Sequence, residues 1–376
     1  MKHLAACVAL ILLPCPLAIA QSAAPSDAIR LEQEGRLPEA EKAWRAVAAG
    51  NPKDAAAFAS LGVVLSKQEK YSEAAGAYKK ALAIDPTLPG IPLNLGLAEF
   101  KRGEFALAIA PLKAALKQEP SSLQARTLLG MSYYGAKRFS DAVDYLEPVV
   151  QSDPENSELR RILAQSCLET KKYSCAEEQF RKILEHDPDS ADAHILTGEA
   201  LDGLQRTDEA IAEFEQARKL APKEPEIHFG LGYLYWKSRK YDEAAKEFQA
   251  ELSISPGHAQ SLAYLGDIEL KQNHLEDAAS FLEKSIQQRK DLRIAYLDLG
   301  EVRGQQKQYP EAIRAYQRAI ELDPSQPDAH YRLGRIYLAM GQPERAKLEF
   351  AKTRDLHEKN DAAAVLKLNT SQPSPQ

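Results

Sequence analysis

The chain has 376 residues, of which 44% are hydrophobic, 27% charged and 7% aromatic, and its formal net charge is −6. This much apolar material excludes wholesale disorder, and four cysteines are too few for a disulfide scaffold. The negative charge disfavours binding to phosphates, so we expect no nucleic-acid partner. A mean hydropathy of −0.42 excludes a polytopic membrane protein.

The start of the chain has the pattern of a signal peptide. A positively charged beginning, Lys2, precedes the apolar run Leu4–Leu13, which is too short to span a bilayer. The small residues Ala18 and Ala20 follow at the spacing that signal peptidase requires. We therefore expect residues 1–20 to be removed and the mature protein to be exported, either periplasmic or secreted, with no membrane span after cleavage. An uncleaved segment that anchors the chain is the alternative.

The rest of the chain repeats with a period of 34 residues. Glycine occupies eight positions of this register: Gly62, Gly96, Gly130, Gly198, Gly232, Gly266, Gly300 and Gly334. Ten alanines stand twelve residues after the positions of the register: Ala40, Ala74, Ala108, Ala142, Ala176, Ala210, Ala244, Ala278, Ala312 and Ala346. Large apolar residues follow four positions later: Trp44, Tyr78, Leu112, Leu146, Phe180, Phe214, Phe248, Leu282, Tyr316 and Phe350. Proline closes most of the repeats.

This succession of small and large residues resembles the tetratricopeptide repeat. The resemblance extends from Gln21 to about Asn360 and implies an all-α fold. The implied architecture is an α-solenoid of about ten 34-residue helix-turn-helix repeats that form a right-handed superhelix. We place the repeats at residues 21–54, 55–88, 89–122, 123–156, 157–190, 191–224, 225–258, 259–292, 293–326 and 327–360. A capping helix is expected at 361–368 and a disordered tail at 369–376.

Packing explains the pattern. Two antiparallel helices approach closely only where neither carries a bulky side chain, so we expect the glycine of the first helix to meet the alanine of the second. The proline denies the preceding residue the α region and ends the second helix. One repeat cannot bury both faces of its helix pair, so stability must come from stacking on neighbouring repeats.

No catalytic motif occurs in the chain: there is no HExxH, GxSxG, P-loop or paired CxxC. We therefore expect no enzyme activity, no catalytic residue and no cofactor. His194, His228 and His330 recur at the fourth position of their repeats. Stacked helices would hold them about one helix diameter apart, which is too far for a shared metal ion at ligand distances of about 2 Å. No metal site is expected.

The resemblance implies that the first helices of the repeats line a binding groove. Aromatic residues that would face it form an i, i+4, i+7 stripe on one helical face, Phe229, Tyr233 and Trp236. A second group of large residues is Phe100, Met131 and Tyr134, and an acidic lining comes from Glu199, Asp202 and Asp267. The alternative is that the aromatic residues only pack against the next first helix. The Asn and Lys or Arg pattern of a carboxylate clamp is absent, so recognition of a free C-terminus is not expected.

Two functions fit these features. The first is a non-enzymatic scaffold or adaptor in the cell envelope that holds segments of partner proteins in the groove. The second is an accessory subunit of an exopolysaccharide synthesis or export machine, or of a secretion machine, that contacts glycan or an enzyme partner. Glycan remains possible as a ligand because the apolar faces of sugars stack on aromatic rings.

Cys167 and Cys175 are the two cysteines that remain after the expected cleavage. They fall on the two helices of one repeat, near the turn that joins them, and an oxidising compartment favours a disulfide between them. Closing so short a loop could contribute about 2.6 kcal/mol. The alternative is a pair of buried free thiols that act as small apolar residues.

Overall fold

The computed structural model describes residues 24–370, so the predicted signal peptide lies outside the described residues. Over this range the chain forms twenty α-helices and no strand. The first helices of the pairs are α1 (Pro25–Gln33), α3 (Ala55–Lys67), α5 (Ile91–Lys101), α7 (Leu123–Gly135), α9 (Ser157–Glu169), α11 (Ala191–Gly203), α13 (Ile227–Lys237), α15 (Ala259–Lys271), α17 (Arg293–Gln305) and α19 (Asp328–Ala339). The second helices are α2 (Leu37–Gly50), α4 (Tyr71–Ile84), α6 (Phe105–Gln118), α8 (Phe139–Ser152), α10 (Tyr173–His186), α12 (Thr207–Leu220), α14 (Tyr241–Ile254), α16 (Leu275–Gln288), α18 (Tyr309–Leu322) and α20 (Pro343–Thr370).

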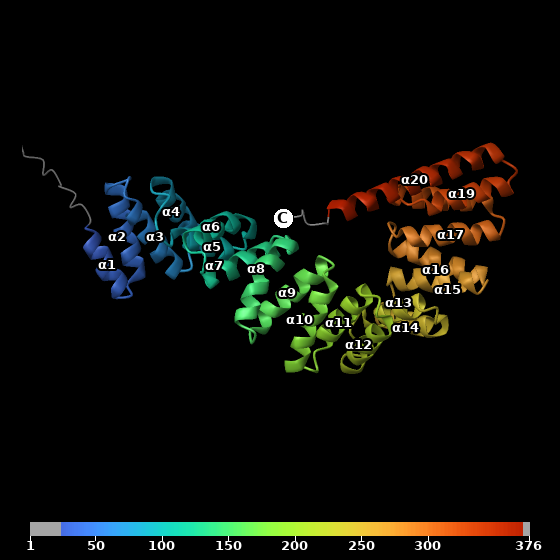
Figure 1. Cartoon of the computed structure of the whole chain (residues 1–376), viewed down its shortest axis with the longest axis horizontal. Helices are drawn as coiled ribbons and strands as arrows, with labels where there is room; N and C mark the ends of the chain where they lie inside the picture. Colours follow the sequence, from blue (N-terminus) through green and yellow to red (C-terminus); the bar gives the residue numbers. More distant parts are fainter. Residues whose placement is uncertain (1–23, 371–376) are drawn as a thin grey trace, which may run out of the picture. The chain divides into compact units, whose positions relative to one another are not determined.

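The chain divides after Thr170 into two compact parts. The N-terminal part contains α1 to α9 and the C-terminal part contains α10 to α20. Within each part, every helix packs against the next one along the chain (Figure 1). This arrangement of helix pairs confirms the predicted fold class, an all-α solenoid. In the described residues, no helix has the length and apolar character needed to cross a membrane.

In the eight repeats that carry it, the glycine of the register makes room for the large apolar residue of the second helix. A Cβ atom added to Gly62 would lie 2.4 Å from the ring of Tyr78. A Cβ atom on Gly266 would lie 2.6 Å from Leu282 and 3.2 Å from the carbonyl oxygen of Ala278. The expectation that glycine meets alanine is therefore corrected. The nearest atoms belong to the large side chain, and the small alanine lets the two helices come close enough for that side chain to reach the glycine.

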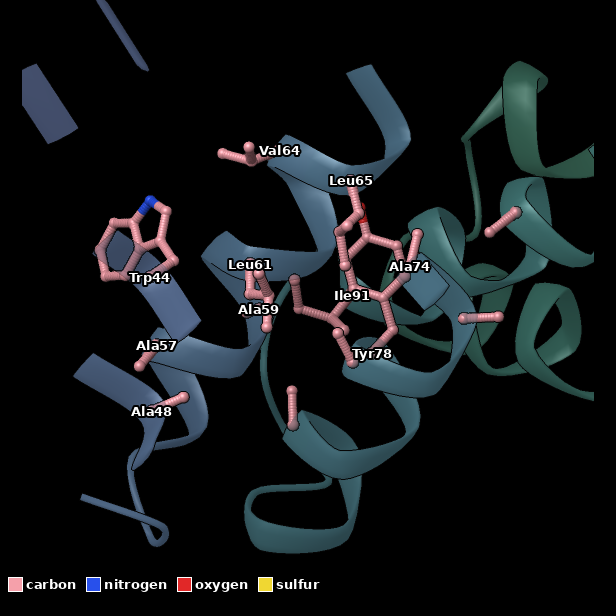
Figure 2. Close-up of a cluster of buried hydrophobic side chains, with 14 of the residues drawn as sticks. Trp44, Ala48, Ala57, Ala59, Leu61, Val64, Leu65, Ala74, Tyr78 and Ile91 are labelled. Atoms are coloured by element: carbon pink, nitrogen blue, oxygen red, sulfur yellow. The ribbon is translucent and has the colours of Figure 1, made fainter. Parts of the chain in front are cut away.

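The core is shared between neighbouring repeats. The ring of Tyr78, on α4, is only 1% exposed. Figure 2 shows it beside Leu65 of α3 and Ile91 of α5, so one side chain joins the helices of two repeats. Because each repeat completes its core with side chains of the next, the array is stabilised by nearest-neighbour stacking.

The turn inside each repeat contains a residue in the left-handed region of backbone space. These ten residues also recur every 34 positions: Gly35, Glu69, Gly103, Lys137, Lys171, Gln205, Arg239, Asn273, Lys307 and Gly341. In the second repeat, Lys70 N–H donates to the Leu65 carbonyl oxygen at 2.9 Å and closes the end of α3. Most of these residues are not glycine, so the sequence pattern did not reveal the position.

Two first helices begin in an unusual way. The regular beginning is a polar cap, as at Asp54, whose side chain accepts a backbone N–H of the first turn. In the third and seventh repeats Pro89 and Pro225 follow the cap position, and the helix begins only after a left-handed residue, Gly90 (φ 72°) or Glu226 (φ 75°). Pro89 and Pro225 stand where the regular first helices begin, and α5 and α13 begin two residues later, after the left-handed residue.

The C-terminal end differs from the expectation. α20 runs without a break over 28 residues, from Pro343 to Thr370. Residues 361–368 are therefore not a separate capping helix but an extension of the last second helix (Figure 1). Of the predicted tail, residues 369–370 are helical, and 371–376 lie outside the described residues. On α19, Tyr331 and Leu338 remain 50% and 51% exposed.

Candidate partner-binding groove

A cavity of about 270 Å³ lies along the first helices α11 and α13 of the C-terminal part. Its lining comes from α11, from α12, from the residue before α13 and from α13 itself: Ile195, Glu199, Asp202, Phe214, Glu226, Phe229, Gly230, Tyr233 and Leu234. We call this cavity the α11–α13 groove. It brings together four of the predicted site residues, Glu199, Asp202, Phe229 and Tyr233.

An aromatic ring between two glycines contributes to the lining. Phe214 is 5% exposed. A Cβ atom on Gly198 of α11 would lie 2.6 Å from this ring, and one on Gly230 of α13 would lie 2.3 Å from it. The two glycines therefore let α11 and α13 both approach Phe214. Gly230 lies outside the 34-residue glycine register, and this second packing role explains it.

Phe229 and Tyr233 add half-buried aromatic rings to the groove. The Phe229 ring lies 5.9 Å from that of Phe248, and the Tyr233 ring meets Tyr264 edge-on at 5.8 Å. These contacts hold both side chains in place from α14 and α15. The aromatic surface of the groove is thus supported by the repeat behind it.

Trp236 and Asp267 have a structural role that the sequence analysis assigned differently. The Trp236 indole N–H donates to Asp267 Oδ2 at 2.6 Å, and its ring meets Tyr264 edge-on at 5.0 Å. Asp267 is 6% exposed and also pairs with Lys271. These side chains connect α13 to α15, so the packing alternative holds for Trp236. Asp267 is buried in this connection rather than offered to a partner.

Three carboxylates surround the aromatic surface. Asp202 pairs with Lys237 Nζ at 2.6 Å, so a cation of the chain opposes its charge. The Glu226 side chain is 65% exposed, and its Oε1 lies 3.4 Å from His258 Nε2. Glu199 is exposed on α11. The groove therefore combines apolar rings with negative charge, which is complementary to a ligand that has an apolar and a cationic group.

The predicted residues of the N-terminal part are engaged in packing. The ring of Phe100 meets Phe105 of the same repeat edge-on at 5.4 Å. The Tyr134 hydroxyl donates to Gln165 Oε1 at 2.6 Å, which connects α7 to α9. Met131 is half-buried on α7. These three residues belong to the N-terminal part and do not contribute to the α11–α13 groove.

The recurring histidines connect the two helices of a repeat. Each Nδ1 lies within hydrogen-bond distance of a glutamate on the second helix: His194–Glu213 at 2.6 Å, His228–Glu247 at 2.7 Å and His330–Glu349 at 2.6 Å. In residues 24–370, no group of three or more histidine, cysteine or carboxylate side chains could hold a metal ion.

Cys167 is fully buried in α9, and Cys175 lies half-buried in α10. Both are disulfide-bonded in the structure. Cys7 and Cys15 lie outside the described residues. The oxidation state of the two cysteines in the protein as produced by the cell stays a prediction.

Five residues of the groove were not predicted from the sequence: Ile195, Phe214, Glu226, Gly230 and Leu234. Phe214 occupied a regular core position of the repeat, so nothing marked it as part of a cavity. The off-register Gly230 was the available signal, because an extra glycine in a helix indicates a close approach of another group. Pro225 was the corresponding signal for Glu226, because it interrupts the regular start of the helix.

Comparisons with known protein families agree with the repeat geometry. A tetratricopeptide repeat model matches residues 28–89, 93–157, 195–259 and 229–292, which is more than half of the chain. Further models of the same repeat match residues 133–200, 302–341 and 328–359. The chain belongs to the tetratricopeptide repeat family.

No curated protein matches the sequence. Among solved structures, the tetratricopeptide array resembles the APC/C hetero-tetramer Cut9–Hcn1 with a TM-score of 0.53 and 15% identity, over 93% of this chain and 83% of the other. Yeast Tom70 matches with a TM-score of 0.42 and 16% identity, over 93% and 96% of the two chains. MamA of Desulfovibrio magneticus RS-1 matches with a TM-score of 0.41 and 21% identity, over 45% and 95%. At these identities the likeness to Cut9–Hcn1 shows the fold alone.

Proposed function

We propose that this tetratricopeptide repeat protein is a non-enzymatic interaction scaffold whose α11–α13 groove binds an extended segment of a partner protein. The bound segment carries a lysine or arginine next to an apolar residue. The observation that carries this proposal is the combination, in one cavity, of aromatic side chains with the carboxylates Glu199, Asp202 and Glu226.

The size of the groove suits side chains of a peptide. Its volume of about 270 Å³ lies just below the roughly 300–1,000 Å³ of typical small-molecule sites, which leaves room for one or two side chains. Half-buried rings such as Phe229 and Tyr233 supply apolar area and attract a cation to their faces. The carboxylates favour that cation over a neutral or acidic group.

Tyr233 is the residue whose removal tests the proposal most cleanly, because it lines the groove and, unlike Trp236, is not tied to α15 by a hydrogen bond to Asp267. We expect Tyr233→Ala to weaken peptide binding by at least about 2 kcal/mol, roughly thirtyfold, because binding energy concentrates in a few large anchors. The measurement is a titration with peptides selected from a random dodecamer library displayed against the full chain.

Tyr331→Ala is the matched control, because Tyr331 is a tyrosine on another first helix, α19, and is 50% exposed. This control should leave affinity unchanged, and circular dichroism should show the same helicity for both variants. Selected peptides without enrichment of basic next to apolar residues would contradict the proposal. Equal affinity of the parent and Tyr233→Ala would do the same.

Glycan binding is the competing outcome. The rings of Phe229 and Tyr233 could also stack on the apolar faces of sugars, as an accessory subunit of an exopolysaccharide machine would require. Retention of the parent, but not of Tyr233→Ala, on immobilised polysaccharide would favour that function. If, in addition, no peptide were selected from the library, glycan binding would replace peptide binding as the proposed function of the groove.

We further propose that the protein is exported to the periplasm or beyond. Two observations support this: the signal-peptide pattern of residues 1–20 and the disulfide bonding of Cys167 and Cys175, which is typical of oxidising compartments. We expect mass spectrometry of the protein from its own cells to find a mature chain that begins at Gln21, and non-reducing peptide mapping to recover both cysteines as disulfides. An intact N-terminus with free thiols would contradict export.

A further inference from the structure

The residue before α13 has a backbone conformation that glycine would adopt more easily. Glu226 has φ 75°, and the residue at the same position of the third repeat is Gly90, with φ 72°. A residue with a side chain is less stable than glycine in this left-handed region. The seventh repeat therefore has a glutamate at a position where the backbone conformation favours glycine.

A buried side chain holds this conformation. The Glu226 backbone N–H donates to Glu251 Oε2 at 3.1 Å, and Glu251, on α14, is completely buried. Glu251 Oε1 has no hydrogen-bond partner in the described structure. The third repeat has Ala115 at the position of Glu251, so its glycine turn forms without such a holder. Burying a carboxylate is unfavourable for folding. We therefore infer that Glu251 serves the turn that it holds.

The carboxylate that this turn presents belongs to the groove. Glu226 contributes to the lining together with Phe229 and Tyr233, and its side chain is 65% exposed. Its Oε1 lies 3.4 Å from His258 Nε2. Asp202, by contrast, lies 2.6 Å from Lys237 Nζ. Of these two carboxylates, Glu226 is therefore the better placed to pair with a cation brought by a ligand.

We propose that Glu226 determines the specificity of the α11–α13 groove by pairing with a lysine or arginine of the bound segment, and that Glu251 is a positioning residue that holds the turn. This inference rests on the proposed function. Within that function it assigns the cationic preference to one side chain rather than to the overall negative charge of the groove.

The experiment is a double-mutant cycle between the full chain and a synthetic peptide. The probe is a library-selected peptide with a single lysine, and its partner probe has norleucine in place of that lysine. Glu226→Gly should leave the melting temperature unchanged or raise it, because glycine relieves the left-handed backbone. It should weaken binding of the lysine peptide at least about tenfold, as expected for a close charge pair, and should leave binding of the norleucine peptide unchanged.

Two further variants separate charge from position. Glu226→Gln removes only the charge and should reproduce the loss for the lysine peptide. Glu251→Ala should weaken the lysine peptide and spare the norleucine peptide, and Glu251→Gln, which keeps an oxygen acceptor, should restore the lysine preference. A purely structural role of Glu251 would instead weaken both peptides together.

The outcomes distinguish this inference from the proposed function. If Tyr233→Ala weakens both peptides while Glu226→Gly binds the lysine peptide like the parent, the groove is the binding site but Glu226 does not set its specificity. If neither substitution changes binding of either peptide, both the inference and the proposed function are overturned.

Discussion

Replacing Gly232 with alanine should lower the free energy of unfolding by about 1–3 kcal/mol through overpacking. The new Cβ atom would lie 2.7 Å from the ring of Phe248, which is completely buried. That ring also stacks on Tyr264 at 5.3 Å and lies 5.9 Å from Phe229, so it cannot move aside without disturbing the next repeat. The variant should be less stable than the parent even though alanine is more favourable than glycine inside a helix by about 1 kcal/mol.

Gly76→Ala is the matched control, and it should have the opposite sign. Gly76 lies within α4 and is exposed, and a Cβ atom there would meet nothing within 4 Å. This substitution should therefore raise the free energy of unfolding by about 1 kcal/mol. Urea denaturation followed by circular dichroism measures both variants. If both substitutions were stabilising, the pairing of glycine with the large residue of the second helix would be wrong.

Replacing Asp298 with asparagine should stabilise the C-terminal part at pH 8 and stabilise it less at pH 5. Asp298 lies on α17, is 5% exposed, and its Oδ2 has no hydrogen-bond partner in the described structure. Burial, followed by the negative charge of Asp267, raises the pKa of Asp298 to about 7, and Glu301 adds to this effect. Arg332, whose Nη1 lies 3.9 Å from Oδ1, and Lys271 oppose the rise only in part.

The direction of the pH effect follows from proton binding. Because the pKa of Asp298 is higher in the folded chain, the protonated form stabilises the fold below about pH 4, and this contribution is lost as the pH rises to about 7. Asparagine is neutral throughout and removes that loss. A pKa difference of about three units corresponds to about 4 kcal/mol as an upper limit.

Urea denaturation of the parent and the Asp298→Asn variant at pH 5 and pH 8 measures this difference. Hydrogen exchange of the α17 amides gives a local reading, because a repeat array can open locally before it unfolds globally. Asp189→Asn, in an exposed loop, is the control and should change stability little at either pH. A stability difference between Asp298→Asn and the parent that is the same at both pH values would contradict the raised pKa.

The fold could be predicted because its determinants recur. The 34-residue spacing of glycine, alanine and a large apolar residue encodes the helix pairs, since each helix crossing needs the same combination of sizes. The continuous α20 also had a signal in the sequence: Glu358 stands where most repeats carry the proline that follows the second helix. The left-handed turns had no comparable signal in the sequence. Residues such as Lys137 and Lys307 adopt this conformation, and lysine is not a residue type that indicates it.

The site was predictable only in part, because residues on one helical face can have different neighbours. Tyr233 and Trp236 lie three residues apart on α13, yet Tyr233 lines the groove while Trp236 donates to Asp267. Which of the two residues lines a cavity depends on the side chains of α15 that contact it, and α15 belongs to the next repeat. The strained turn at Glu226 likewise depends on Glu251, which lies 25 residues away.

Photo-crosslinking from within the groove tests the central claim most directly. The full chain would carry p-benzoylphenylalanine in place of Ile195, which lines the α11–α13 groove, or in place of Leu107, which is 52% exposed on α6. Each protein would be irradiated with the lysine peptide selected from the library. We predict that the peptide crosslinks from position 195, that unlabelled peptide competes for this product, and that Tyr233→Ala abolishes it. Crosslinking from position 107 alone, or with equal yield from both positions, would contradict the claim that this groove is the binding site.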